Sequence, residues 1–382
     1  MINNTPYDST THEKPWLINR NNSDAIIGPE GEPLTADYIW SKQGKDREDL
    51  VLWVFNYYRG KGFPFVELSD EEMRKKFNVL KKKNPDDIVN DEGEFKNSSS
   101  LGNDIYKTFL GKEYFSAKGT EKTKSVYEVF YDDELFLKVL KNRMGYCLTK
   151  EDGEERSYCF TISDKMIIQG IHSTSYGYNV SLFKPVIGKW IYKYYAKKRI
   201  FDYSSGWGSR SLAAMSLGIE YYGVDPLTSV GINKMMKFFD GEGYVVDGCS
   251  EDEEVYKNIP MVDCVMSSPA YFNLENYSDS ETQSINRYKE YENWLEEYWK
   301  KTVENCLSIL EDEGYFILFV KNKVGKYNLA EDMKKICEGS GELKLEKMMN
   351  IRTSNSHLSG KKLSKKISKN TELVYIWRKE NG

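Results

Sequence analysis

The sequence predicts an α/β protein with a doubly wound, mostly parallel sheet. The first observation is residues 200–210, where an apolar run passes through Gly206 and Gly208 into a helix-forming stretch. The second is a series of further apolar runs between residues 220 and 266, each followed by Gly, Asp, Ser or Pro. Strands that alternate with helices in this way build a parallel sheet, whose carboxyl edge holds the ligand.

The first strand of this sheet ends in the turn around Gly206 and Gly208. The apolar residues before the turn predict a buried strand, and residues 212–215 (Leu-Ala-Ala-Met) predict the helix that follows. Backbone N–H groups at such a helix N-terminus bind nucleotide-like ligands, and glycine lets the ligand approach the backbone. A Gly-x-Gly pair alone is a weak signal, because many such turns bind nothing.

The second strand, residues 220–224, ends in Asp225 and Pro226. Asp225 lies 17 positions after Gly208, close to the interval of about 20 residues at which a carboxylate reaches ribose hydroxyls. Asp followed by Pro is also a common helix start. Asp225 is therefore a candidate N-cap as well as a candidate ribose ligand.

The third and fourth strands, residues 243–247 and 262–266, complete the predicted carboxyl edge. Ser250 follows the third strand and is a candidate helix cap or a contact of an adenine ring. Asp263 lies inside the fourth strand, either as a satisfied core group or at the edge of a cofactor site. Residues 267–272 (Ser-Ser-Pro-Ala-Tyr-Phe) follow the fourth strand, so polar and aromatic side chains gather at this edge.

The segments that follow finish the predicted sheet. Residues 288–310 carry aromatic and aliphatic residues at helical spacing, and residues 314–320 (Gly-Tyr-Phe-Ile-Leu-Phe-Val) predict a fifth strand. Residues 343–351 and 372–378 predict a closing pair of strands.

These motifs resemble those of class I S-adenosylmethionine-dependent methyltransferases, specifically the enzymes that modify exocyclic amino groups of DNA bases. Residues 202–208 (Asp-Tyr-Ser-Ser-Gly-Trp-Gly) are similar to that family's Asp-Pro-Phe-x-Gly-x-Gly cofactor loop. Residues 268–271 (Ser-Pro-Ala-Tyr) resemble its (Asp/Asn/Ser)-Pro-Pro-(Tyr/Phe/Trp) catalytic tetrad, and residues 183–185 (Phe-Lys-Pro) its Lys-Pro motif. The resemblance covers residues 165–380 and implies a Rossmann-like sheet of seven strands.

The resemblance implies S-adenosylmethionine as the cofactor and DNA as the partner. The cofactor-binding residues that it implies are Lys184, Pro185, Asp202, Ser204, Gly206, Gly208, Asp225 and Ser250. The catalytic residues are Ser268, Pro269 and Tyr271. In the family, the first side chain and the proline carbonyl accept hydrogen bonds from the target amino group, and the aromatic ring stacks on the flipped base.

These residue types suit methylation of an aromatic amine. The lone pair of such an amine is delocalised into the ring and attacks a methyl group poorly. Acceptors at Ser268 and at the Pro269 carbonyl hold the amino hydrogens so that the lone pair turns toward the donor, and alignment lowers the barrier further. The base must leave the duplex, and stacking on Tyr271 offsets part of that cost. A serine in the first tetrad position is commoner in the family's cytosine-modifying members, but adenine and cytosine both stay open.

One residue departs from the tetrad in a way that leaves the function open. Ala270 stands where the family has a second proline, and alanine leaves the loop freer than proline does. We expect activity to survive because the positions that contact the substrate are kept. The alternatives are a catalytically silent DNA- or cofactor-binding descendant, or the same fold acting on RNA or a small molecule.

The composition limits which partners and which cellular compartment are expected. The formal net charge of −5 gives no sign of a polyanion-binding protein as a whole, so DNA contacts must come from local patches. The strongest patch lies between the last two strands. Phe272, beside the tetrad, is expected to be a pocket-wall or core aromatic rather than a second stacking platform, and is a weaker candidate for DNA contact. The candidate DNA contacts are Phe272, Arg352, Lys361, Lys362, Lys365 and Lys366. Scattered cysteines, no apolar run of membrane-spanning length and a polar start without a signal-peptide core predict a cytoplasmic protein.

Three regions are expected along the chain. Residues 1–45 read as a polar arm with little regular structure, and residues 46–164 as an accessory or target-recognition region that is largely helical. Residues 165–382 are the expected methyltransferase domain. Within the accessory region, residues 50–59 predict a helix or a buried strand, and residues 133–144 predict a helix.

Overall fold

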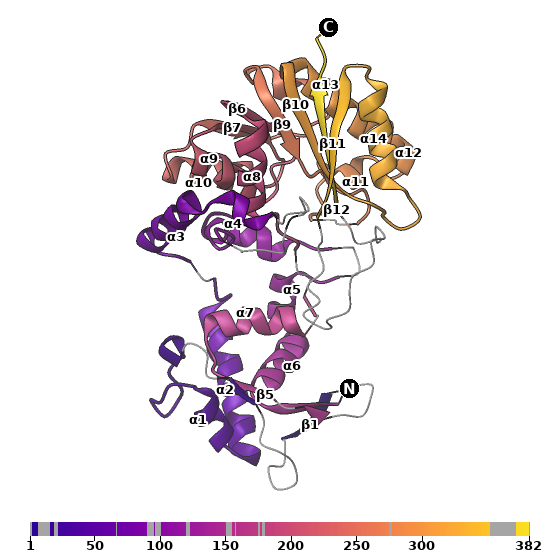
Figure 1. Cartoon of the computed structure of the whole chain (residues 1–382). Coiled ribbons are helices and arrows are strands. Elements are labelled where there is room, and N and C mark those ends of the chain that lie inside the picture. The colour runs from indigo at the N-terminus through magenta and orange to yellow at the C-terminus, as the bar shows by residue number, and fades with distance from the viewer. Residues whose placement is uncertain are drawn as a thin grey trace. The chain divides into compact units, whose positions relative to one another are not determined.

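A computed structural model describes most of the chain (Figure 1). The described residues are 2–6, 16–18, 22–65, 67–89, 95, 101–119, 123–149, 155–156, 158–174, 176–177, 180–274, 277–351 and 372–381. They form two compact units, Met1–Val66 with Phe115–Val180, and Glu67–Tyr114 with Ser181–Gly382. The limits expected at residues 45 and 164 do not coincide with those of the units, because residues 67–114 fold with the sheet.

The second unit contains a seven-stranded sheet. Its strands are β6 (Arg199–Asp202), β7 (Glu220–Val224), β8 (Gly243–Val246), β9 (Val262–Ser267), β10 (Leu310–Lys321), β11 (Leu343–Ile351) and β12 (Glu372–Lys379). The order in the sheet is β11-β12-β10-β9-β6-β7-β8. Strands β6 to β10 are parallel, and β12 is antiparallel to both β10 and β11. The predicted doubly wound, mostly parallel sheet is confirmed, with the strand arrangement of the class I methyltransferase fold.

Helices cover both faces of this sheet. The helices of this part of the chain are α8 (Pro185–Tyr195), α9 (Ser209–Leu217), α10 (Ser229–Phe238), α11 (Ser284–Arg287), α12 (Tyr291–Asn293), α13 (Lys301–Ile309) and α14 (Leu329–Gly339). Short helical turns are η3 (Glu253–Tyr256) and the π-helical η4 (Trp294–Lys300), which joins α12 to α13 within the predicted long helix. The chain therefore alternates strand and helix through the sheet, as expected.

Alternate residues of β10 point to the two faces of the sheet, as the strand period of two requires. Phe316 belongs to a buried cluster with Val303 of α13 and Met333 of α14. The ring of Phe319 instead lies 5.1 Å from that of Phe183, just before α8. Helices α13 and α14 thus cover one face, and the approach to α8 covers the other.

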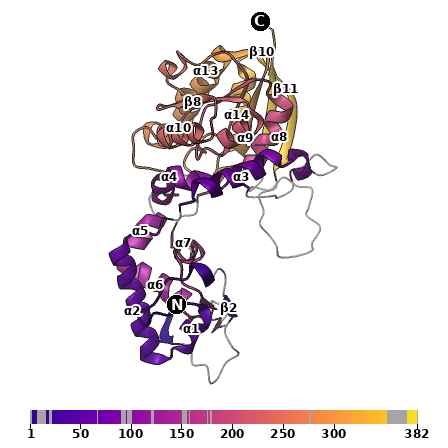
Figure 2. The ribbon, with the colours of Figure 1, turned by 90° about the vertical axis from the view of Figure 1, so that its left-hand side faces the viewer.

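Residues 67–114 add a helical layer to the second unit. Helix α3 (Asp70–Lys82) starts with a capping box between Ser69 and Glu72, and is followed by η2 (Pro85–Ile88) and α4 (Ile105–Ser116). Figure 1 and Figure 2 both show α3 and α4 beside α9 and α10. The buried Lys189 of α8 fixes this layer: its Nζ donates to the carbonyls of Leu80, Lys81 and Lys83 at 2.7, 2.7 and 3.0 Å. These carbonyls lie at the end of α3, where helices leave carbonyl groups without a following turn to bond them; that of Leu80 also accepts from the N–H of Lys83 at 3.3 Å.

The first unit is mainly helical with small sheets. Its helices are η1 (Asn22–Asp24), α1 (Ala36–Ser41), α2 (Gly44–Lys61), α5 (Val126–Tyr131), α6 (Asp133–Arg143) and α7 (Asp164–Ser173). Its strands are β1 (Ile2–Pro6), β2 (Trp16–Ile18), β3 (Tyr146–Thr149), β4 (Glu155–Arg156) and β5 (Tyr158–Phe160). Residues 50–59, expected as a helix or a buried strand, lie in helix α2, and the helix predicted at residues 133–144 is present as α6.

The expectation of an N-terminal arm with little regular structure is wrong. Residues 36–41 form α1, whose Ala36 and Ile39 are buried, and residues 2–6 and 16–18 are strands. Thr35 caps α1 by accepting a hydrogen bond from the N–H of Tyr38. Among the described residues, no helix is long and apolar enough to cross a membrane.

Candidate active site

The two glycines after β6 adopt left-handed conformations for different reasons. Gly206 has a φ of 56° and Gly208, the N-cap of α9, a φ of 74°. A Cβ atom added to Gly208 would lie 2.6 Å from Cε of Met235, so this glycine allows α9 to approach α10. A Cβ added to Gly206 would meet nothing nearer than 3.8 Å. Among the described residues, no atom therefore packs closely over Gly206, as a ligand approaching the backbone requires.

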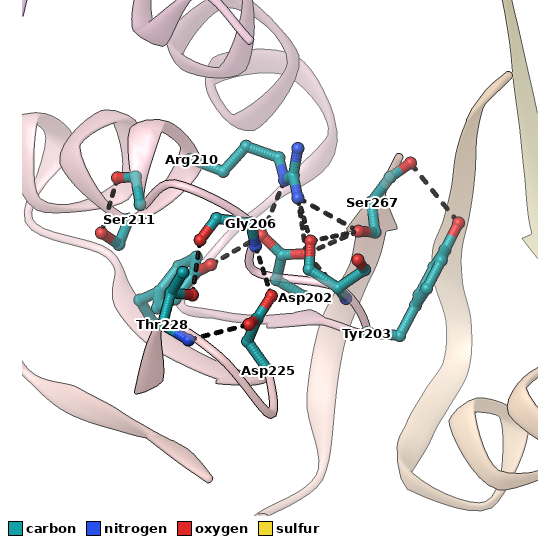
Figure 3. Close-up of polar contacts among 11 residues, drawn as sticks. Asp202, Tyr203, Gly206, Arg210, Ser211, Asp225, Thr228 and Ser267 are labelled. Atoms are coloured by element: carbon teal, nitrogen blue, oxygen red, sulfur yellow. Dashed lines mark hydrogen bonds and ion pairs between the residues drawn. The ribbon is translucent and has the colours of Figure 1, made fainter. Parts of the chain in front are cut away.

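The end of β7 holds Gly206 in place (Figure 3). The N–H of Gly206 donates to Asp225 Oδ2 at 2.9 Å, and Thr228 Oγ1 donates to the Gly206 carbonyl at 2.5 Å. Oδ1 of Asp225 accepts from the N–H groups of Leu227 and Thr228 at 2.9 and 3.0 Å. Burial raises the pKa of Asp225, and these backbone donors oppose that rise. Asp225 thus caps the turn that leads into α10, and its ribose contact stays a prediction.

The carboxylate of Asp202 lies at the centre of a buried network, drawn in Figure 3. It accepts from Arg210 Nε at 2.7 Å, from Tyr221 Oη at 2.6 Å and from Ser267 Oγ at 2.6 Å. Arg210 Nη2 and the N–H of Ser204 add longer contacts, both at 3.2 Å. Asp202 is 0% exposed, so its negative charge is balanced within the protein by Arg210.

Arg210 contacts both the Phe-Lys-Pro motif and the residues of the glycine turn. Its guanidinium carbon lies 5.1 Å from the ring centroid of Phe183. Lys184 is the N-cap residue of α8 and Pro185 occupies the first helical turn, as expected for proline. Burial lowers the pKa of Lys184. Burial also acts to lower the pKa of Arg210, but the adjacent Asp202 raises it overall, so the guanidinium is charged.

The Ser-Pro-Ala-Tyr segment begins directly after the Asp202 network. Ser267, the last residue of β9, donates to Asp202, and Ser268 follows it. The hydroxyls of Ser268 and Tyr271 lie 2.8 Å apart. The structure thus brings the three predicted motifs together at the carboxyl ends of β6 and β9.

Phe272 is a core aromatic rather than a surface residue, as the sequence favoured, and a contact of its ring with DNA stays a prediction. It is 3% exposed, with a φ of 50°. Its ring lies 5.2, 5.8 and 5.6 Å from the rings of Tyr291, Trp294 and Tyr327. The turn after Tyr271 therefore directs Phe272 into the hydrophobic core, where it anchors the tetrad.

Ser250 is also a residue of the protein core. Its hydroxyl lies 2.9 Å from Oγ1 of Thr302 in α13, and its carbonyl accepts from the hydroxyl of Tyr256 at 2.8 Å. Ser250 is 4% exposed, so its side chain is used inside the protein, and a contact of this loop with an adenine ring stays a prediction. Its neighbour Glu251 pairs with Arg287 at 2.8 Å, and burial raises the pKa of Glu251 to about 6.

Asp263 is a structural residue, one of the two roles that the sequence left open. Its carboxylate accepts from the N–H groups of Lys197, Lys198 and Arg199 at 2.6, 2.8 and 2.9 Å. These residues lead into β6, at the amino end of the sheet. Asp263 therefore fixes the turn between α8 and β6 and lies at the opposite edge from the glycine turn.

Sequence reasoning missed several contributors to this site. Arg210 and Tyr221 were not singled out, because nothing local marks a helical arginine or a strand tyrosine as a partner of a buried aspartate. Trp207 lies in the glycine turn, and its ring is 5.4 Å from that of Tyr114 and 5.8 Å from that of Tyr277. The aromatic character of Trp207 was visible, but its partners come from distant parts of the chain.

The predicted basic patch lies outside the described residues. Its members are Arg352, Lys361, Lys362, Lys365 and Lys366. Strand β11, which ends at Ile351, is antiparallel to β12 and therefore parallel to β10. The chain consequently leaves β11 at the edge of the sheet where β6 and β9 end.

Comparisons with known proteins show similarity of fold at low sequence identity. No family model matches the chain, and neither does any curated protein sequence. Among solved structures, TrmN from Thermus thermophilus is 12% identical with a TM-score of 0.33, and the match covers 52% of this chain and 49% of TrmN. An S-adenosylmethionine-dependent methyltransferase from Clostridium acetobutylicum is 10% identical, with coverage of 52% and 90% and a TM-score of 0.34. The N-methyltransferase NodS from Bradyrhizobium japonicum, solved with S-adenosyl-L-homocysteine, is 9% identical, with coverage of 50% and 82% and a TM-score of 0.33. This chain thus spans about half the length of TrmN.

Proposed function

We propose that the protein is an S-adenosylmethionine-dependent methyltransferase that acts on the exocyclic amino group of adenine or cytosine in DNA. One observation carries this proposal: the buried network at the glycine turn includes Ser267, the residue directly before the Ser268–Tyr271 corner. Ser267 donates to Asp202, which begins the turn, at 2.6 Å, and Ser268 is the next residue. A donor on the turn and an amine at the corner would therefore be neighbours.

The residues of the turn fit a nucleoside-bearing cofactor. No side chain caps α9 at Gly208, and the hydroxyl of Ser209 is buried without a hydrogen-bond partner among the described residues. A polar ligand would satisfy such groups. The residues that would hold S-adenosylmethionine are Lys184, Pro185, Ser204, Gly206, Gly208 and Asp225. Bound there, this cofactor supplies an electrophilic methyl group.

Ser268 and the carbonyl of Pro269 would orient the target amine. When the Ser268 hydroxyl donates to Tyr271, 2.8 Å away, both lone pairs of its oxygen remain available to amino hydrogens. Holding these hydrogens directs the nitrogen lone pair toward the methyl group, and this alignment lowers the barrier. Tyr271 would place its ring against a base that has left the duplex.

One feature favours a polyanion such as DNA. The basic segment with Lys361 and Lys365 lies outside the described residues, but it follows β11, which ends at the edge of the sheet where β6 and β9 end. Contacts of such a segment with phosphates weaken steeply as salt rises. The aromatic amine that the corner of Ser268 and Pro269 suits occurs in the bases of DNA and RNA alike, so the choice between them is left to the experiment.

Incubation with isotopically labelled S-adenosylmethionine and unmodified DNA, followed by nucleoside mass spectrometry, tests the proposal. We expect label on adenine or cytosine, and parallel reactions with RNA and free nucleosides test the alternative substrates. Label only on RNA or on a nucleoside would refute the DNA assignment. If the protein binds S-adenosylhomocysteine but transfers no methyl group, the result would support the alternative of a catalytically silent descendant, for which Ala270 is the reason.

Variants of the corner test the assigned roles. Ser268→Ala and Tyr271→Ala should each lower turnover by about a hundredfold, the scale of one lost transition-state contact, with affinity for S-adenosylhomocysteine unchanged. Tyr271→Phe keeps the ring and isolates the hydroxyl. Ser308→Ala, which removes an exposed hydroxyl that donates to the Asn305 carbonyl, is the matched control. Loss of cofactor binding in both corner variants would contradict their roles.

A further inference from the structure

The tetrad residue Tyr271 lies at the centre of a tight turn. The N–H of Phe272 donates to the carbonyl of Ala270 at 3.0 Å, so three residues close this turn. Phe272 has a φ of 50°, which is unusual for an aromatic residue and persists only where the surrounding structure holds it. The position of Tyr271 therefore depends on what holds its two neighbours.

Both neighbours are held by one short element, the π-helix η4. Trp294 begins η4, and its ring lies 5.8 Å from that of Phe272. Four positions later in η4, the hydroxyl of Tyr298 accepts from the backbone N–H of Ala270. The rings of Trp294 and Tyr298 contact each other, with centroids 5.0 Å apart. π-Helical segments are rare and occur frequently at functional sites, and this one supplies two aromatic residues to the tetrad turn.

Tyr298 is a well-fixed partner for Ala270. It is 5% exposed and belongs to the same buried cluster as Tyr271. Burial raises the pKa of Tyr298, so its hydroxyl is neutral at physiological pH. This hydroxyl also bonds with that of Ser250, which lies 2.9 Å from Oγ1 of Thr302 in α13. A chain of buried hydroxyl groups thus holds the N–H of Ala270 in place.

We infer that Tyr298 is a positioning residue for the tetrad, whose hydroxyl holds the Ala270 N–H and thereby fixes the ring of Tyr271 for the target base. A proline at position 270 would restrain the backbone through its own ring and would carry no N–H. Alanine lacks that restraint, and the bond to Tyr298 supplies it from outside the turn. This inference rests on the proposed function, and it names a residue that acts through the tetrad rather than on the base.

A double-mutant cycle between positions 298 and 270 of the full chain tests this role. Tyr298→Phe removes only the hydroxyl and should lower kcat for methyl transfer about 3- to 10-fold, the range of one neutral hydrogen bond. The KM for S-adenosylmethionine should stay within about twofold. In the Ala270→Pro background, Tyr298→Phe should cost less than about twofold, because the proline leaves no N–H to hold. Ala270→Gly keeps the N–H and should keep the full cost of Tyr298→Phe.

Tyr256→Phe is the matched control. Tyr256 belongs to the same cluster and is 7% exposed, and its hydroxyl also bonds a backbone group, the carbonyl of Ser250, at 2.8 Å. The two Tyr→Phe variants should lose similar stability in urea, but Tyr256→Phe should keep the kcat of the wild-type protein. Equal falls of kcat in both would overturn the inference, because loss of packing would then explain them. A folded Tyr298→Phe variant with wild-type kcat would also overturn it, as would the full cost in the Ala270→Pro background.

Amide hydrogen exchange followed by mass spectrometry measures the bond without turnover. In peptides that cover residues 268–274, exchange at Ala270 should be about 3- to 10-fold faster in Tyr298→Phe than in the wild-type protein. Tyr256→Phe should leave this exchange unchanged. Unchanged exchange in Tyr298→Phe would overturn the inference even if the enzyme is active. Faster exchange in Tyr298→Phe, together with no methyl transfer by the wild-type protein, would instead remove the proposed function and leave the bond in place.

Discussion

Alanine substitutions at the two turn glycines should have opposite consequences. Both residues have left-handed backbones, which cost an L-residue about 1 kcal/mol or more. In Gly208→Ala the new methyl group would also lie 2.6 Å from Met235 and 3.3 Å from Ile232, which adds about 1–3 kcal/mol of overpacking. Gly208→Ala should therefore lower the free energy of unfolding by about 2–4 kcal/mol, and Gly206→Ala by about 1 kcal/mol.

Ligand binding should show the reverse order. A methyl group on Gly206 would occupy the free space beside Arg210, so Gly206→Ala should bind S-adenosylhomocysteine at least about tenfold more weakly. Gly218→Ala is the matched control: Gly218 ends α9 with a φ of 71°, and a Cβ there would meet nothing within 4 Å. It should lose the same stability as Gly206→Ala and bind the ligand like the wild-type protein.

Urea denaturation with linear extrapolation measures the stabilities, and calorimetric titration measures the affinities. Comparing Gly208→Ala with Gly218→Ala isolates the clash with Met235 from the backbone term. If Gly206→Ala binds S-adenosylhomocysteine as tightly as Gly218→Ala does, no ligand lies over the turn. That result would refute the placement of the cofactor, whatever the enzyme methylates.

Two further predictions concern groups around the sheet. Asp263→Ala leaves three backbone N–H groups without their acceptor, so the free energy of unfolding in urea should fall by about 2–4 kcal/mol; a smaller loss, or weaker ligand binding by the folded variant, would contradict its structural role. The raised pKa of Glu251, about 6 against an unfolded value of 4.5, makes its contribution to stability present below pH 4.5 and lost as the pH rises through 6. Glu251→Gln should thus match the wild-type protein near pH 4.5 and exceed it by up to about 2 kcal/mol above pH 7. Urea denaturation at both pH values measures the two free energies of unfolding. If the variant differs from the wild-type protein by the same amount at both pH values, the ion pair with Arg287, and not the titration of Glu251, sets the effect of this residue on stability.

The sheet could be predicted from the sequence because its determinants are local. The apolar runs that became β6, β7 and β9 are each bounded by residues that end strands, and a strand period or a glycine turn is visible within about ten residues. The antiparallel β12 followed from the resemblance and from the pairing of two apolar segments. The same reasoning located the turn, the tetrad and the Phe-Lys-Pro motif.

The organisation of the N-terminal half could not be predicted in this way. The chain passes from the first unit into the second at residue 67 and back into the first at residue 115, because residues 67–114 fold with the sheet. Neither expected boundary, at residue 45 or at residue 164, therefore coincides with a limit of the units. The contacts responsible are distant in sequence: Lys189 caps α3 through the carbonyl of Leu80, 109 positions earlier. Neither residue carries a local signal of this pairing.

The same limit separates the location of a site residue from its role. Asp202, Ser250 and Phe272 all follow or end strands, as expected, yet each side chain is committed to the protein interior. Which way a residue points after a strand depends on the partners supplied by other elements: Arg210 for Asp202, Thr302 for Ser250 and the aromatic cluster for Phe272. A motif therefore predicts where a ligand lies more securely than which side chain touches it. At the corner after β6, the sequence located Asp202, but its role as the buried partner of Arg210 comes from a residue of α9.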